Sequence, residues 1–154
     1  VLHPVFAKYK EKFMKLKNDN IQILETSQIK YYKLFNECKL LITDYSSIHF
    51  DVAFLKKPII YYQFDKDYFM KHHYHKGYFD YDNDGFGKVT KTENDTIDEI
   101  EYYIKNNCKI RNEYKSKIEK TFQYLDHNNS KRVFDKILEL DNKQERNYRF
   151  NNVH

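Results

Sequence analysis

A polar corner between two apolar stretches is the part of the sequence whose residue types could do chemistry. Residues 40–43 form a short apolar run, Asp44, Ser46 and Ser47 follow it, and an apolar segment then resumes. This order predicts a strand, a tight turn and a helix, whose first N–H groups have no intrahelical partner and point outward. Serine hydroxyls beside such N–H groups can donate hydrogen bonds to a phosphate. The corner, residues 44–47, is therefore interpreted as an anion site.

A single carboxylate, Asp51, follows Ser47 by one helical turn, so the two side chains share a helix face. The neighbours of Asp51 in the sequence are apolar, and burying an unpaired charge is costly. We therefore expect Asp51 to have a partner, such as a sugar hydroxyl or a basic side chain. Two alternatives need no ligand, since serine is a favoured N-cap and Asp44 is a common turn former.

A second polar segment, residues 126–132, precedes the last predicted helix. Asn129 or Ser130 can be the N-cap of that helix. Alternatively, Ser130 together with Arg132 offers a second anion site. Two helix N-termini could bind one diphosphate together, because each offers N–H groups to its oxygens.

Histidines invite a metal interpretation. His72, His73 and His75 lie on one loop, but the loop has no Cys or Glu at ligand spacing, so we predict no metal site and expect one of the three to face the ligand. All three glycines lie between residues 77 and 87, which indicates a functional loop with demanding turns. His3 precedes Pro4 at another predicted strand end.

The elements that must position these groups alternate along the chain. We predict strands at residues 1–4, 21–24, 40–43, 58–62 and 88–90, and helices at 5–17, after 26–27, after 47, and at 94–104, 110–124 and from 130. This alternation predicts an α/β fold, a Rossmann-like parallel sheet with flanking helices, which binds ligands at the carboxyl ends of its strands. We assign residues 1–140 to one domain and residues 141–154 to a polar C-terminal tail.

Composition narrows the class of protein. The 154 residues carry a formal charge of +4, with basic and acidic residues interspersed, so no nucleic-acid stripe is expected. No apolar run is long enough to cross a bilayer. Cys38 and Cys108 lack metal-site spacing and indicate free thiols in a reducing compartment. The chain starts without a methionine, and we expect it to be a piece of a longer protein.

Five motifs in order resemble the CDP-glycerol glycerophosphotransferases, which are the teichoic-acid primases and polymerases and their capsule-synthesis relatives. The motifs are His3-Pro4, Thr43 to Ser47 with Phe50-Asp51, Lys57 to Tyr62, Lys76 to Tyr81, and Asp126 with Ser130 and Arg132. The resemblance covers about residues 1–140 and implies the C-terminal half of a two-domain glycosyltransferase-B fold.

The resemblance also implies which residues hold the donor. They are His3, Ser46, Ser47, Asp51, Ser130 and Arg132, with Asp44, Lys76, Gly77 and Asp126 as further candidates. The catalytic base of the family is a histidine of the N-terminal domain, which has no counterpart here. We therefore expect no catalytic residue in this chain, an inactive fragment, and no cofactor or metal.

Three positions depart from the pattern of the family. Lys76 replaces an arginine and loses its bidentate fork, residues 85–87 replace Pro-Gly-Pro, and His127 replaces a glycine. The corner itself is intact. These changes fit a divergent capsular or teichoic branch better than a loss of donor binding.

The resemblance implies transfer of a glycerol-phosphate (polyol-phosphate) unit from CDP-glycerol, or a related CDP-alditol, to an acceptor hydroxyl in teichoic acid or capsular polysaccharide synthesis. The acceptor, lipid-linked or polysaccharide, would be held by the missing N-terminal domain. Peripheral association with the cytoplasmic face of a bacterial cell membrane is the expected location. Two alternatives remain: a sugar-nucleotide-dependent glycosyltransferase domain, and a non-catalytic α/β regulatory domain with Asp44 as a receiver-type acid.

Overall fold

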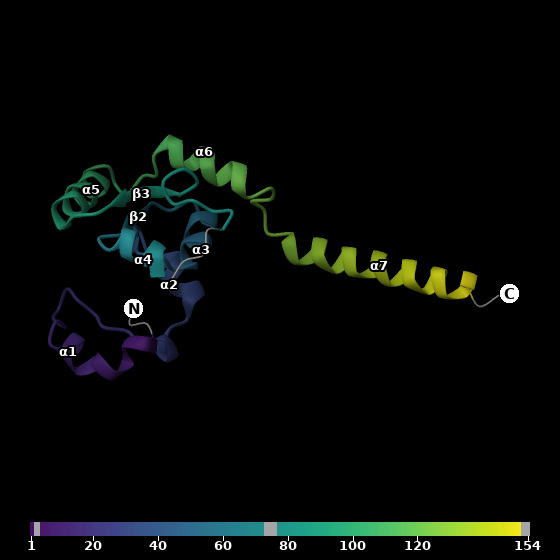
Figure 1. The fold of residues 1–154 in the computed structure, drawn as a ribbon, viewed down its shortest axis with the longest axis horizontal. Coiled ribbons are helices and arrows are strands. Elements are labelled where there is room, and N and C mark those ends of the chain that lie inside the picture. Colours follow the sequence, from purple (N-terminus) through teal and green to yellow (C-terminus); the bar gives the residue numbers. More distant parts are fainter. Residues whose placement is uncertain (2–3, 73–76, 152–154) are drawn as a thin grey trace.

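The computed structural model describes residue 1 and residues 4–72 and 77–151, and it has a three-stranded parallel sheet at its centre (Figure 1). The strands are β1 (Leu41–Thr43), β2 (Ile59–Tyr62) and β3 (Gly87–Thr90), in the order β1-β2-β3. Leu41 pairs with Ile59, and Ile59 pairs with Gly87. The predicted Rossmann-like α/β fold is confirmed by this parallel sheet and its flanking helices.

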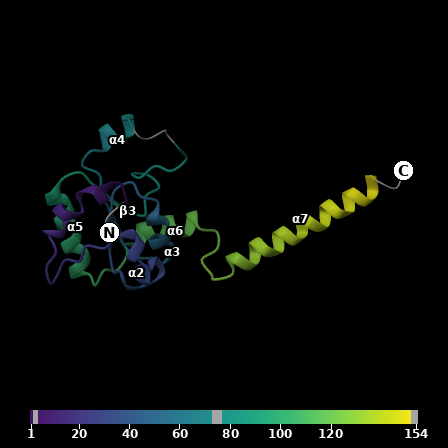
Figure 2. The same ribbon diagram turned by 90° about the horizontal axis from the view of Figure 1, so that it is seen from below.

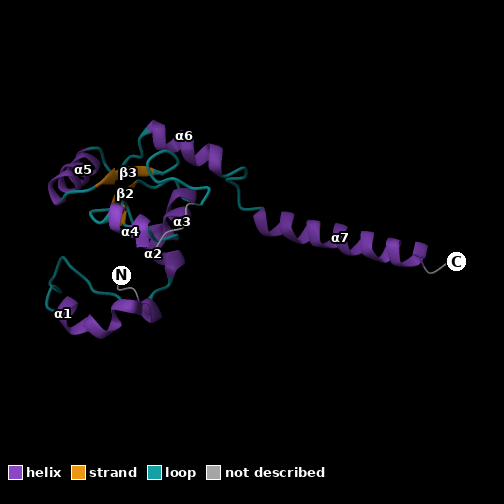
Figure 3. Ribbon diagram, viewed as in Figure 1, coloured by secondary structure: helices purple, strands orange, loops and turns teal. Residues whose placement is uncertain are grey.

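Helices make up most of the remaining structure (Figure 3). They are the 3₁₀ helices η1 (Pro4–Tyr9) and η2 (Thr26–Gln28), and the α-helices α1 (Lys10–Met14), α2 (Tyr31–Glu37), α3 (Ile48–Phe54), α4 (Lys66–His72), α5 (Glu93–Lys105), α6 (Asn112–Thr121) and α7 (Asn129–Asn151). Among the described residues, none of these helices combines the length and apolar character needed to cross a bilayer.

The central strand β2 is buried on both faces because helices cover each of them. Ile59 and Tyr61 pack with Val52 and Ala53 of α3 and with Ile118 of α6. Side chains alternate along a strand, so the next residue, Ile60, lies on the other face, which α5 covers. A continuous apolar strand of this kind is typical of a parallel sheet.

Several predicted elements differ from the structure. Residues 21–24 form no strand; only an isolated bridge joins Asn18 and Ile21, so the segment lacks a sheet neighbour to pair with. The helix predicted at 5–17 is divided into η1 and α1. Helix α5 begins at Glu93, one residue before the predicted start at 94, and its cap is Thr92, whose hydroxyl accepts a hydrogen bond from the Asp95 N–H at 3.1 Å. The strand predicted at 1–4 includes residues outside the described part of the chain.

The last helix, α7, extends away from the body of the molecule in two perpendicular views (Figures 1 and 2). It continues to Asn151, past the start of the predicted tail at residue 141. Ion pairs between residues three and four apart, Lys136–Glu139 at 2.8 Å and Lys143–Glu139 at 2.6 Å, favour helix in this polar stretch. The assignment of residues 141–154 to a separate tail stays a prediction.

Candidate functional site

The predicted corner lies where β1 ends and α3 begins, as the sequence indicated. Ser46 and Ser47 are both exposed. Ser47 is the N-cap of α3, but its side chain makes no capping hydrogen bond. Within the described residues, the N–H groups of Ser46 and Ser47 have no acceptor. The corner therefore presents two hydroxyls and two N–H groups to solvent at the carboxyl end of a parallel strand, where ligands bind in such sheets.

Asp44 shapes the corner through its own backbone. Its carboxylate accepts a hydrogen bond from the N–H of Tyr45 at 2.6 Å, which is the local contact of a turn former. Its carbonyl accepts a hydrogen bond from the side-chain amide of Gln63 at 3.1 Å. Asp44 thus fixes the turn, and its carboxylate is also exposed at the surface.

Tyr45 anchors the corner to the loop that follows β2. Its ring stacks on Phe69 of α4 with the ring centroids 3.6 Å apart. Its hydroxyl donates to Asp65 at 2.9 Å, and its carbonyl accepts from the hydroxyl of Tyr81 at 3.0 Å. Burial, followed by the hydrogen bond to Asp65, raises the pKa of Tyr45, so this hydroxyl stays protonated.

Asp51 differs from the prediction in one respect. The residue is exposed, so burial does not require it to have a partner. It lies at the edge of a cavity of about 360 Å³ between α2 and α3, whose walls include Phe35, Phe54 and Phe122. The position of Asp51 leaves it free to meet a hydroxyl or a cation from outside the chain.

His49 is a buried polar residue of α3 that the sequence interpretation missed. Its side chain is 1% exposed and lies among the rings of Phe50, Phe79, Tyr81 and Phe86. A signal was present, because His49, Val52 and Ala53 have the spacing of one inward helix face.

The Tyr61 hydroxyl joins His49 to the loop before β3. Its oxygen accepts from the Phe86 N–H at 3.3 Å and lies 2.8 Å from His49 Nδ1, to which it is hydrogen-bonded. Burial lowers the pKa of His49 to about 4. His49 fastens α3 to β2 and does not reach the exposed corner as a base.

The free energy of unfolding is expected to rise with pH between about 4 and 6.5 because of His49. Its pKa is about 4 in the folded chain and 6.5 ordinarily, so the unfolded chain binds more protons in this window. Across this window the gain in the free energy of unfolding from His49 is on the order of 3 kcal/mol. Urea unfolding at a series of pH values measures it. His49→Asn should show a smaller rise than the wild type, and equal slopes would contradict the assignment.

Arg132, at the start of α7, is occupied by a carboxylate. Its guanidinium forms a two-point contact with Asp126, at 2.7 Å and 2.6 Å, and stacks over Tyr124. The hydrogen bond to Arg132 is the main cause that holds the pKa of Asp126 below its usual range. No hydrogen bond or ion pair joins Arg132 or Ser130 to the corner within the described part of the chain. Their place in the donor site stays a prediction.

Several of the remaining candidate site residues lie outside the part of the chain that the structure describes. His3, Lys76, His73 and His75 lie outside the described residues, and the exposed Gly77 directly follows that gap. His72 is described, and its Nδ1 lies 3.0 Å from the carbonyl of Tyr68. In the ranges 4–72 and 77–151, no group of three His, Cys, Asp or Glu side chains could hold a metal ion.

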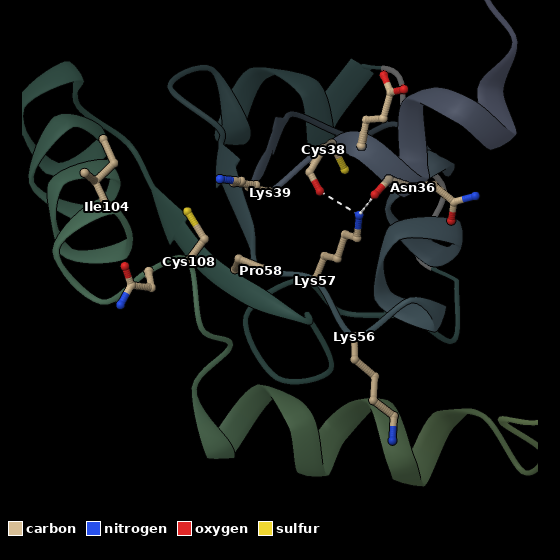
Figure 4. Close-up of a pocket in the computed structure, with 10 residues that line it drawn as sticks. Asn36, Cys38, Lys39, Lys56, Lys57, Pro58, Ile104 and Cys108 are labelled. Carbon is tan, nitrogen blue, oxygen red and sulfur yellow. Dashed lines mark hydrogen bonds between the residues drawn. The ribbon is translucent and has the colours of Figure 1, made fainter.

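A larger cavity, of about 590 Å³, opens at the opposite end of the sheet (Figure 4). Lys39, Pro58, Ile104 and Cys108 are among its lining residues. Strands β1 and β2 begin here, so the cavity is at the amino ends of the strands rather than at the ligand-binding end. The dashed lines in Figure 4 show that Lys57 donates to backbone carbonyls beside it.

Replacing Lys57 by methionine is expected to lower the free energy of unfolding by about 2 kcal/mol, since hydrogen bonds to charged groups contribute most. The ammonium of Lys57 donates to the carbonyls of Phe35, Asn36 and Cys38 at 2.6, 2.5 and 2.7 Å, and so caps the end of α2. Thermal and urea unfolding measure the loss. Lys39→Met, at an exposed lysine of the same cavity, is the control, and equal losses in the two variants would refute the capping role.

Comparison with known proteins finds one family model and three relatives that match the chain. The family model described as CDP-Glycerol:Poly(glycerophosphate) glycerophosphotransferase matches residues 1–139. The chain is 40% identical over 126 residues to the minor teichoic acid biosynthesis protein GgaB of Bacillus subtilis (strain 168), an alignment that covers 82% of this chain and 13% of GgaB. No solved structure matches the chain.

Two further relatives come from Bacillus spizizenii (strain ATCC 23059 / NRRL B-14472 / W23). A teichoic acid glycerol-phosphate primase is 38% identical over 66 residues, which is 43% of this chain and 16% of the primase. A teichoic acid poly(ribitol-phosphate) polymerase is 33% identical over 100 residues, which is 64% of this chain and 15% of the polymerase. The chain thus spans only a small part of the length of each of these three relatives.

Proposed function

Because the chain belongs to the CDP-glycerol:poly(glycerophosphate) glycerophosphotransferase family, we propose that it binds the nucleotide donor of a teichoic-acid or capsule transferase. The enzyme would move a glycerol-phosphate, or a related polyol-phosphate, from CDP-glycerol or another CDP-alditol to an acceptor hydroxyl. The observation that carries this proposal is the corner at residues 44–47. Its exposed serine hydroxyls, and its N–H groups that have no acceptor in the described ranges 4–72 and 77–151, suit the oxygens of a diphosphate.

The proposed reaction is a displacement at the β-phosphorus of the donor. The acceptor oxygen forms a bond to that phosphorus, the bond from the β-phosphorus to the bridging oxygen breaks, and CMP leaves with the bridging oxygen. Ser46 and Ser47 would donate hydrogen bonds to the phosphate oxygens, and so hold the donor and stabilise the developing charge. The proton of the acceptor hydroxyl would pass to a base outside this chain.

The wider donor site would include His3, Asp51, Ser130 and Arg132. The planar guanidinium of Arg132 suits a phosphate as well as the carboxylate that it now contacts. A diphosphate would therefore take the place of Asp126 on Arg132. Asp51, which accepts hydrogen bonds only, would meet a hydroxyl of the donor rather than its phosphates.

Product analysis of the whole enzyme that contains this chain tests the proposed reaction. The enzyme is incubated with CDP-glycerol, or CDP-ribitol, and a polyol-phosphate acceptor, and the released nucleotide is identified by mass spectrometry. Release of CMP is expected. Release of a nucleoside diphosphate from a sugar nucleotide would instead identify a glycosyltransferase, and no turnover of any nucleotide would favour a regulatory domain.

The 154-residue chain alone is proposed to be inactive, because the acceptor and the base would come from another part of the protein. Turnover of CDP-glycerol by residues 1–154 would contradict this division. Binding of the acceptor at the cytoplasmic face of the membrane belongs to the same proposal, and co-sedimentation of the whole enzyme with membranes tests it.

A further inference from the structure

We propose that Gln63 and Tyr81 are positioning residues that orient the backbone of the corner for phosphate binding. The proposal rests on the function proposed above. Tyr81 ends the motif Lys76 to Tyr81, but neither Tyr81 nor Gln63 is among the residues that the resemblance implies for holding the donor. Both residues lie behind the corner: Gln63 follows β2, and Tyr81 lies in the loop before β3. Each donates a hydrogen bond to a carbonyl of the corner.

The two hydrogen bonds draw successive carbonyls toward the interior. The side-chain amide of Gln63 donates to the carbonyl of Asp44 at 3.1 Å, and the hydroxyl of Tyr81 donates to the carbonyl of Tyr45 at 3.0 Å. Gln63 is fully buried and Tyr81 is 7% exposed. The carbonyls of Asp44 and Tyr45 therefore point toward the protein and away from the exposed surface of the corner.

Because the peptide group is planar, the direction of each carbonyl also fixes the direction of the N–H in the same peptide group. In a trans peptide the N–H points opposite to the C=O, and the peptide bonds of the chain are all trans in the described residues. The N–H of Tyr45 meets the carboxylate of Asp44 at 2.6 Å. The N–H of Ser46 has no acceptor among the described residues and is directed outward. It is thus the backbone group that a phosphate oxygen can meet first.

Both positioning residues are themselves held firmly. The backbone N–H of Gln63 donates to the carbonyl of Thr90 at 2.8 Å, which extends the sheet by one more bond. The ring of Tyr81 packs edge-on against Tyr61, with the ring centroids 5.1 Å apart. It also lies beside the His49 ring, with the centroids 5.6 Å apart. The corner is therefore braced against the sheet and against the aromatic core.

The side chain of Gln63 also has an unfavourable energy of burial that a residue serving only to fill space would avoid. Its Oε1 is buried and has no hydrogen-bond partner in the described part of the chain. Leaving a polar atom in this state is unfavourable, and a leucine would fill similar space without it. The amide is used for one contact, the carbonyl of Asp44, which is the contact expected of a residue that orients the corner.

Orientation matters because a flipped peptide would present its carbonyl, and not its N–H, to the phosphate. Preoriented donors bind an oxyanion without reorganisation, whereas a carbonyl oxygen repels it. Tyr81 and Gln63 should therefore affect the recognition of phosphate groups, and not of the nucleoside. This distinguishes a positioning role from a general effect on folding.

Amide NMR titrations of the 154-residue chain test the proposal with two probes, CDP and inorganic pyrophosphate. In the wild type, the Ser46 amide signal is expected to shift with saturation for both probes. Tyr81→Phe, which removes only the hydroxyl, should weaken both affinities about 5- to 10-fold, the effect of one hydrogen bond. Gln63→Leu is a second variant that should weaken both affinities in the same direction but less, because the Tyr45 N–H that it orients already meets the carboxylate of Asp44. It serves if Tyr81→Phe does not fold.

Tyr103→Phe is the matched control, because the Tyr103 hydroxyl is buried in α5 without a hydrogen-bond partner among the described residues. It should bind both probes like the wild type. Equal affinities in Tyr81→Phe and Tyr103→Phe would overturn the positioning role while leaving CDP binding intact. If the wild type binds pyrophosphate but does not bind CDP, the proposed donor is wrong. The pyrophosphate affinities of the variants would then still test the role of Tyr81. Binding of neither probe would overturn both proposals.

Discussion

Replacing Glu99 by alanine is expected to lower the free energy of unfolding by about 3 kcal/mol, because it leaves the largely buried guanidinium of Arg111 without its carboxylate partner. Glu99 is 3% exposed in α5. Its two carboxylate oxygens lie 2.7 Å from a guanidinium nitrogen of Arg111 and 3.4 Å from the ammonium of Lys88. The Arg111 contact lacks hydrogen-bond alignment, so its attraction is electrostatic. The carboxylate thus joins α5 to β3 and to the start of α6.

Urea unfolding of three variants beside the wild type checks this prediction. Glu99→Gln keeps the shape and removes the charge, and it should lie between the wild type and Glu99→Ala. The matched control is Glu101→Ala on the same helix, since Glu101 is exposed and pairs with Lys105 at 2.7 Å. Exposed pairs contribute little, so the control should unfold like the wild type. Equal midpoints for Glu99→Ala and Glu101→Ala would show that the buried ion pair is not needed.

Gly87→Ala is the second change with a large expected effect, a loss of about 3 kcal/mol from overpacking. A Cβ atom at Gly87 would lie 1.9 Å from the carbonyl oxygen of Ile59, its partner across the sheet. That oxygen belongs to the backbone of a central strand and cannot move aside like a flexible side chain. Strand β3 would have to shift, and the loop that carries Tyr81 would shift with it.

Thermal unfolding, together with an amide NMR spectrum of the folded fraction, tests the Gly87 prediction. The spectrum should show changed signals at Ser46 as well as in β3, because Tyr81 connects the loop before β3 to the corner. Lys91→Ala, at an exposed residue directly after β3, is the control and should leave the melting temperature unchanged. A variant that melts like the control would contradict the close packing of Gly87 on Ile59.

Local patterns were enough to predict the corner and the strands around it. The apolar run before Asp44, the serines after it and the apolar run at residues 58–62 each predict their elements without knowledge of the rest of the chain. Residues 21–24 have a similar apolar pattern but form no strand, because a strand also needs a neighbour to pair with. That neighbour is a tertiary property.

The candidate site was predictable in its exposed half and not in its buried half. Asp51 was expected to be buried from its apolar neighbours in sequence, but helix periodicity directs His49, Val52 and Ala53 inward and Asp51 outward. That error was avoidable. Gln63 and Tyr81 could not be predicted, because they contact the corner from 19 and 36 residues along the chain.

Calorimetric titration of the chain with CDP, CMP, UDP and ADP tests the central claim, that the corner holds the diphosphate of a cytidine nucleotide. The account predicts that CDP binds more tightly than the other three. It also predicts that Ser47→Ala weakens CDP binding about 5- to 10-fold, while Ser116→Ala, at an exposed serine of α6, has no effect. Undetectable binding of CDP, or full CDP affinity in Ser47→Ala, would contradict it.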